Sequence, residues 1–226
     1  MAEEKEFFCS DLAWEYGVPL VGSATRGDVW FLVEYRGSWG AKAFEESTIP
    51  EAVKTYLSSF SNTEKHIRIL LIRQGPQKPS KSQGHLRFFI GRTSAHHPSL
   101  YEYHLDTYED ILNIAVADII SGEFDDLTHL RREPLYLVCT NGRRDKCCAV
   151  YGPDVYQAMS EETGEAVWQS SHIAGHNQAP IMLFFPHGVN YGHATPSEAR
   201  RLVKAYQQGQ VVLHHYRGRV CYENHQ

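Results

Sequence analysis

Residues 135–148 read LYLVCTNGRRDKCC, an apolar run that passes directly into a polar loop with cysteines at both ends. The run 135–139 has the apolar, β-branched and aromatic content of a buried strand. We therefore expect Cys139 to end a strand. Cys147 and Cys148 then stand where the loop leads into a helix.

A second segment, WQSSHIAGH at 168–176, carries His172 and His176 just beyond the next predicted strand. The ends of two neighbouring parallel strands lie about 5 Å apart. Two thiols and two imidazoles can therefore meet at one edge of a sheet, although they come from separate loops.

The predicted elements follow the same order in the two halves of the chain. Eight strands are predicted, at 29–35, 67–73, 86–91, 101–105, 135–139, 166–171, 181–185 and 189–192. Each half has the order strand, helix, strand, strand, strand, helix, which is typical of a thioredoxin-like layer with a mixed sheet. We predict an α/β fold of two similar halves, as an old duplication would produce. The predicted halves are residues 1–125 and 130–226, joined near 123–133.

The helices are predicted from local signals. Thr195 as N-cap, Pro196 at the first helical position and Glu198 together form a capping box. The four predicted helices are 195–209, one that begins at Pro50, one from Thr107 through Ile119, and one from about Pro153 to Thr163.

The composition is that of a globular chain: 226 residues, 42% hydrophobic, with a formal net charge of −5. We expect no membrane span, because no run of about 18 apolar residues occurs. The start lacks a basic segment followed by an apolar run, so no secretory signal is expected either. The negative charge argues against nucleic acid as the main partner.

The five cysteines are an odd number, and without an export signal they favour the reducing cytoplasm over a disulfide framework. In that compartment clustered cysteines indicate metal or redox chemistry. Cys9 and Cys221 lie outside the cluster, and we expect them to be small buried side chains.

The donor types narrow the choice of metal. Two thiolates and two imidazoles suit zinc or an iron–sulfur centre, and they suit magnesium and calcium poorly. Eight residues separate Cys139 from Cys148 and seven separate Cys139 from Cys147, against about two to four in zinc fingers. The wide loop favours a cofactor larger than a single metal ion, such as a [2Fe–2S] cluster, in which each ligand pair binds one iron.

Two other uses of these residues remain open. A structural Cys2His2 zinc ion would make the chain a binding or interaction domain. A nucleophilic Cys147 or Cys148 would make it a thioredoxin-like thiol oxidoreductase, although no C-x-x-C pair is present.

Three stretches, CTNGRRDKCC, VWQSSHIAGHNQAP and LFFPHGVNYG, resemble the signature segments of the sucrase/ferredoxin-like family. The upstream stretch VWFLVEYRGSWG resembles that family's N-terminal half. The resemblance implies a thioredoxin-like [2Fe–2S] ferredoxin domain over 130–226, preceded by a similar half without cluster ligands.

The resemblance also implies the ligands: Cys139 and Cys148 match the family's cysteine pair, and His172 and His176 match its histidine pair. Cys147 would then be an unused neighbour. Ala174 departs from the family pattern, which often has glycine there. Because a methyl group is small, we expect the site to tolerate it.

We therefore expect an electron-transfer protein with one [2Fe–2S] cluster, more a redox carrier than an enzyme. Cys139 and Cys148 would bind the inner iron, and His172 and His176 the outer iron, where a proton can accompany the electron. The expected partners are a reductase and an acceptor protein, in the cytoplasm and without a membrane. Glycoside hydrolysis is not expected, because no carboxylate pair stands out in the sequence.

Overall fold

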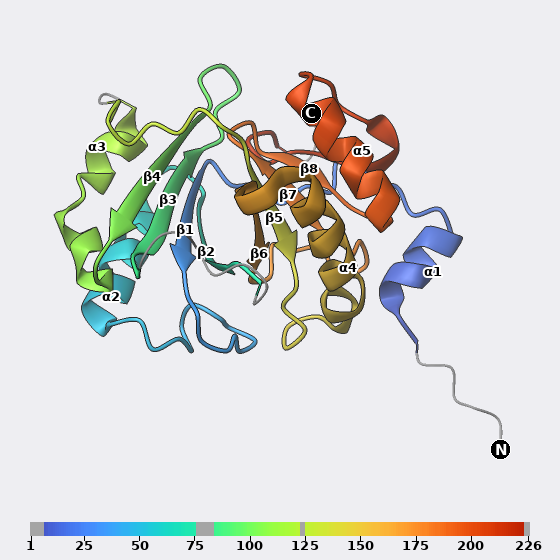
Figure 1. Ribbon diagram of the computed structural model, residues 1–226, viewed down its shortest axis with the longest axis horizontal. Coiled ribbons are helices and arrows are strands. Elements are labelled where there is room, and N and C mark those ends of the chain that lie inside the picture. The colour runs from blue at the N-terminus through green and yellow to red at the C-terminus, as the bar shows by residue number, and fades with distance from the viewer. Residues whose placement is uncertain (1–6, 76–83, 123–124, 224–226) are drawn as a thin grey trace.

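The computed structural model describes residues 7–75, 84–122 and 125–223. Within these residues, nine strands form one sheet (Figure 1). The strands are β1 Val29–Glu34, β2 Ile67–Arg73, β3 Leu86–Arg92, β4 Ser99–Leu105, β5 Leu135–Cys139, β6 Val167–Ser170, β7 Met182–Phe185, β8 Val189–Tyr191 and β9 Tyr216–Arg219. Their order across the sheet is β4-β3-β1-β2-β6-β5-β7-β8-β9.

The helices flank this sheet. They are α1 Cys9–Glu15, α2 Glu51–Ser59, α3 Val116–Ser121, α4 Lys146–Thr163 and α5 Pro196–Gln207, with short 3-10 helices η1 Phe60–Asn62, η2 Tyr108–Asn113, η3 Gly164–Ala166 and η4 Leu213–His215. In Figure 1, α2 and α3 lie beside the N-terminal strands, and α4 and α5 lie beside the C-terminal strands. In the described part of the chain, no helix has the length and apolar character needed to cross a bilayer.

The two halves share one strand topology. In the first half β1 pairs in parallel with β2 and antiparallel with β3, and β3 pairs with β4. The second half repeats this pattern with β5, β6, β7 and β8. Antiparallel pairing of β2 with β6 joins the halves into one sheet. The predicted α/β fold with two similar halves is confirmed.

The predicted domain boundaries, 1–125 and 130–226, stay a prediction, because the sheet runs continuously through both halves. Residues 123 and 124 of the predicted join lie outside the described residues.

The sheet curls, so that strands that are not neighbours meet on its inner face. The ring centroids of Phe89 on β3 and Trp168 on β6 lie 5.8 Å apart, and those of Trp30 on β1 and Phe185 on β7 lie 6.0 Å apart. Adjacent strands are about 4.8 Å apart, so a flat sheet would keep these rings much farther from each other. Cys139, Cys147 and Cys148 belong to the same inner core cluster as these rings.

Two helix predictions were wrong in their extent. Thr107 does form a capping box with Asp110, but Ile114 has an extended backbone, so η2 and α3 replace the single helix. The hydroxyl of Tyr56 donates a hydrogen bond to the carbonyl of Ile114 at 3.1 Å and supports this break.

The helix predicted from about Pro153 begins seven residues earlier, at Lys146. Its N-cap is Asp145, whose Oδ1 accepts a hydrogen bond from the backbone N–H of Cys147 at 2.9 Å. Pro153 therefore lies inside the helix, a position that proline usually avoids. The capping signal before it, D-K-C-C, decides where the helix starts.

Besides the short 3-10 helices, one strand and one α-helix of the described residues were not predicted. Strand β9 pairs antiparallel with β8 and has no counterpart in the first half. Helix α1 places Cys9 at its first position, where it is exposed, while Cys221 is half-buried. The prediction that both are small buried side chains was therefore wrong, because each lies in a peripheral segment.

Candidate metal centre

Cys139 lies at the carboxyl end of β5, in register with Ser170 at the end of β6. His172 follows two residues later at the same edge of the sheet. Sγ of Cys139 lies 3.9 Å from Nδ1 of His172. The parallel pair of strands thus brings one predicted cysteine and one predicted histidine together.

Cys148 comes to this point from the first turn of α4, and its backbone N–H donates to the carbonyl of Asp145 at 3.1 Å. Ligand atoms of Cys139, Cys148 and His172 all lie within 4.8 Å of one another. A Cβ at Gly152 would stand 2.3 Å from the carbonyl oxygen of Cys139, so glycine lets α4 pack closely against the end of β5.

His176 lies on the solvent side of this group. Its ring stacks on that of His172 with centroids 5.0 Å apart, and its side chain is 64% exposed. Asp145, His172 and His176 form a second group of possible ligands within 4.8 Å. His172 belongs to both groups, so the four predicted residues share one site without forming one compact tetrad.

The loop between the two histidines has an unusual backbone. Ala174 and Gly175 are consecutive residues with φ of 104° and 103°. Only glycine adopts such angles readily. This turn is what brings His176 back beside His172 and Asp145.

The two buried thiols have unequal acidity. The hydrogen bond with Cys148 lowers the pKa of Cys139 despite its burial, and His172 and the backbone of Asn141 act in the same direction. That same hydrogen bond, together with burial, raises the pKa of Cys148. Cys139 is therefore the thiol of the pair that loses its proton more readily, and the thiolate is the form that binds metal.

Asp145 was not among the predicted site residues. Its side chain is 5% exposed, and Oδ2 lies 3.4 Å from Nδ1 of His176. Within the described residues this oxygen has no hydrogen-bond partner. The N-cap position before Lys146 was the signal that could have identified it.

Arg217 on β9 was also missed. It is 1% exposed, and it donates to the carbonyl of Ala174 at 3.2 Å and to that of Ser23 at 2.6 Å. Among the described residues no carboxylate forms an ion pair with it. Burial lowers the pKa of Arg217 to about 10, so the side chain stays charged at neutral pH beside the 172–176 loop.

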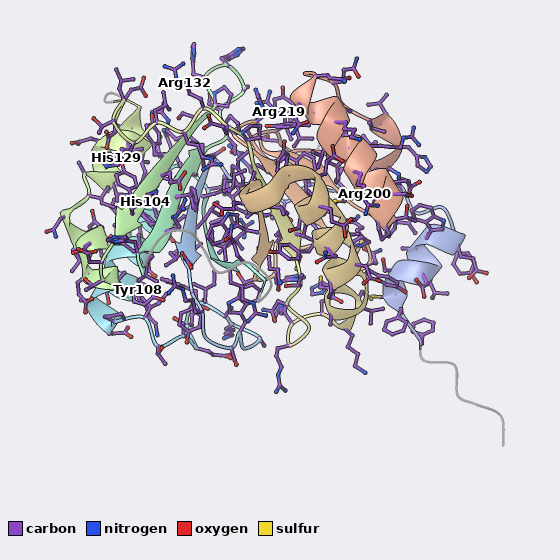
Figure 2. All side chains as sticks on the ribbon, in the orientation of Figure 1. His104, Tyr108, His129, Arg132, Arg200 and Arg219 are labelled. Carbon is purple, nitrogen blue, oxygen red and sulfur yellow. The ribbon has the colours of Figure 1, made fainter. Side chains whose placement is uncertain are left out.

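The residues around this site differ from those around the surface histidines elsewhere in the protein. Arg143 and Arg144 are exposed in the loop between β5 and α4, where they make its rim positive. Figure 2 shows His104 and His129 beside β4, away from α4. Each lies beside a carboxylate there, with Nδ1 of His129 2.7 Å from Oδ2 of Asp126, so both already have a polar partner on the surface.

In a comparison with known proteins, the chain is similar to altered inheritance of mitochondria protein 32 from Meyerozyma guilliermondii. It is 30% identical over 112 residues, which is 45% of this chain and 38% of that protein. The chain therefore matches well under half of the length of this relative.

Among solved structures, the wild-type thioredoxin-like [2Fe–2S] ferredoxin from Aquifex aeolicus aligns with a TM-score of 0.35 and 17% identity, over 39% of this chain and 99% of that chain. A cysteine-to-serine variant of it aligns with a TM-score of 0.34 and 19% identity, over 38% of this chain and 99% of that chain. The strand order described above, and not this likeness, establishes the fold.

The family comparison covers much more of the chain. The sequence model of the sucrase/ferredoxin-like family matches residues 20–218, which include both strand sets and all four predicted ligands. This protein belongs to the sucrase/ferredoxin-like family.

Proposed function

We propose that this chain is an electron-transfer protein that binds one [2Fe–2S] cluster through Cys139, Cys148, His172 and His176. The observation that carries the proposal is the meeting of the first three ligand atoms within 4.8 Å, with His176 stacked outside them. A cluster with two metal atoms needs its ligands in two pairs rather than in one compact tetrad.

The burial of the donors agrees with such a division. Cys139 and Cys148 are fully buried, His172 is half-buried, and His176 is exposed. The thiolates would hold the inner iron and the imidazoles the outer iron. Electrons would then enter and leave at the histidine edge, which a partner protein can approach.

Two buried polar atoms support the fit of a cofactor. Oγ of Ser170 has no hydrogen-bond partner in the described residues, and Oδ2 of Asp145 has none, its nearest polar neighbour being Nδ1 of His176 at 3.4 Å; buried polar atoms are rarely left in that state. Ser170 pairs with Cys139 across β5 and β6, so the two side chains lie on the same face of the sheet. A hydroxyl there can donate to a ligand sulfur, and the carboxylate can orient His176.

The surrounding charge also suits an anionic group. Arg217 supplies a buried positive charge next to the histidine loop, and Arg143 and Arg144 make the rim positive. We propose that this rim attracts acidic redox partners, a reductase and an acceptor, and that the chain acts in the cytoplasm.

When bound, the cluster would supply a one-electron carrier, and imidazole ligation would place its potential above the roughly −400 mV of all-cysteine plant-type clusters. His172 and His176 would each keep a proton on the ring nitrogen that faces away from the metal. Such a proton can be gained or lost with the electron.

The zinc alternative has weaker geometric support, because a closed tetrahedral site needs all four ligand atoms together and His176 lies outside the compact group. The thiol oxidoreductase alternative conflicts with burial, since Cys147 is 2% exposed and Cys148 is fully buried, so neither offers an accessible sulfur to a substrate.

The deciding experiment is metal and sulfide analysis of the chain purified without oxygen. We expect a red-brown protein with two irons and two acid-labile sulfides per chain. One zinc per chain, with no labile sulfide after anaerobic reconstitution, would refute the cluster and select the zinc domain. Disulfide reductase activity of iron-free protein that persists in Cys9→Ser would instead favour the thiol enzyme.

A further inference from the structure

Two cysteines outside the proposed ligand set lie next to each other. Sγ of Cys9 and Sγ of Cys147 are 3.6 Å apart, although 138 positions separate them in sequence. Cys9 is exposed at the start of α1, whereas Cys147 is 2% exposed in the first turn of α4. The exposed thiol can meet a small reagent, and the buried thiol lies directly behind it.

Contacts on both sides of Cys9 hold this arrangement. Ser10 donates to the carbonyl of Ala179 at 2.6 Å, and the hydroxyl of Tyr151 on α4 donates to Asp11. The thiol of Cys9 itself donates to the carbonyl of His176 at 3.2 Å. A helix as short as α1 is not stable alone, so these contacts place it against α4 and the histidine loop.

We propose that Cys9 and Cys147 form a reversible dithiol–disulfide site that reacts with small-molecule disulfides such as glutathione disulfide. The disulfide would fasten α1 to α4 beside the candidate metal centre. An S–S bond of about 2.05 Å requires the two sulfurs to approach by about 1.5 Å, a movement that side-chain rotation and a small shift of α1 can supply.

The exchange balances in two steps. The thiolate of Cys9 attacks one sulfur of glutathione disulfide, forms a mixed disulfide, and releases one glutathione thiolate. The thiolate of Cys147 then attacks the sulfur of Cys9 and releases the second. Two protein thiols are oxidised, one glutathione disulfide is reduced to two glutathione molecules, and the two thiol protons end on those products.

Cys148 is a poor alternative partner for either thiol. It is fully buried and hydrogen-bonded to Cys139, and a bond to the adjacent Cys147 would be a strained vicinal disulfide. The proposed disulfide site uses none of the proposed cluster ligands. It can therefore be tested independently of the proposed function.

The test treats the full-length chain with glutathione disulfide, alkylates the remaining thiols, and maps linked peptides without reduction. We expect a Cys9–Cys147 link in the wild type and in the control Cys221→Ser, with loss of the free Cys9 thiol in most molecules. In Cys147→Ser the exchange should stop at the mixed disulfide between glutathione and Cys9. In Cys9→Ser no disulfide to Cys147 should form.

A second measurement does not depend on a variant folding correctly. Hydrogen exchange of the α1 amides in the wild type should slow on oxidation and recover with dithiothreitol. Iron and sulfide are counted in the same samples, so cluster binding is judged separately. A free Cys9 in the oxidised wild type, a link from Cys147 to any other cysteine, or unchanged exchange in α1 would overturn the proposal.

Discussion

Replacing Ala174 by glycine should stabilise the protein, although it removes a side chain. Ala174 has φ of 104°, a region where a Cβ costs on the order of 1–3 kcal/mol. Glycine relieves that strain but makes the unfolded chain more flexible, at a cost of about 0.4–1 kcal/mol. The net gain in the free energy of unfolding should therefore be about 1 kcal/mol.

Urea unfolding, with the slope held common to all variants, measures this change, and the thermal midpoint should rise by about 2–4 °C. The matched control is Ala205→Gly in α5, where the same atoms are removed from a helix and about 1 kcal/mol should be lost. If Ala174→Gly leaves the midpoint unchanged or lowers it, as the control does, the positive φ of this loop is refuted.

Three further predictions concern the proposed cluster. Cys148→Ser should abolish the visible spectrum of the cluster whereas Cys147→Ser should keep it; the reverse result would move the ligand by one residue. The wild-type midpoint potential should fall as pH rises, by up to about 59 mV per pH unit for one coupled proton, and His176→Cys should flatten the slope; a flat wild-type titration would show that no histidine is an exposed ligand. Arg217→Met should lower the midpoint potential by removing a buried positive charge, and Arg217→Lys should restore most of it; equal potentials for wild type and the Met variant would show that Arg217 acts through packing alone.

Local signals were sufficient for the elements that position the candidate site. The strand 135–139 occurs where its apolar run predicts it, and the capping box of Thr195 with Glu198 begins α5 as expected. Since neighbouring strand ends must meet at one edge, placing Cys139 near His172 needed only the assumption that their two strands pair in parallel. The structure shows that pairing.

The features that the sequence did not reveal depend on contacts between distant segments. Arg217 is recognisable only once β9 lies against the loop of Ala174, because its partners are two backbone carbonyls and the hydroxyl of Ser23, which form no pattern in the sequence. The meeting of Cys9 with Cys147 likewise requires α1 to pack on α4. The start of α4 was misplaced for a different reason: the helix was predicted to begin at about Pro153, although that proline lies inside it.

The repeated topology gives the two halves equivalent strand ends, and the residues at those ends explain why the possible metal ligands lie in one half. Glu34 ends β1 as Cys139 ends β5, and cross-strand pairing puts Glu34, Ile72, Ser170 and Cys139 in one row across the four central strands. At the Glu34 end, the buried carboxylate accepts from Arg36 at 3.0 Å and from the backbone N–H of Arg87 at 2.9 Å, so its oxygens are satisfied. At the Cys139 end, the neighbours are a second thiol, an imidazole and an unpaired hydroxyl. The equivalent strand end therefore carries a satisfied carboxylate in the first half and leaves soft donors for a cofactor in the second. Among the described residues, both groups of possible metal ligands accordingly lie in the second half.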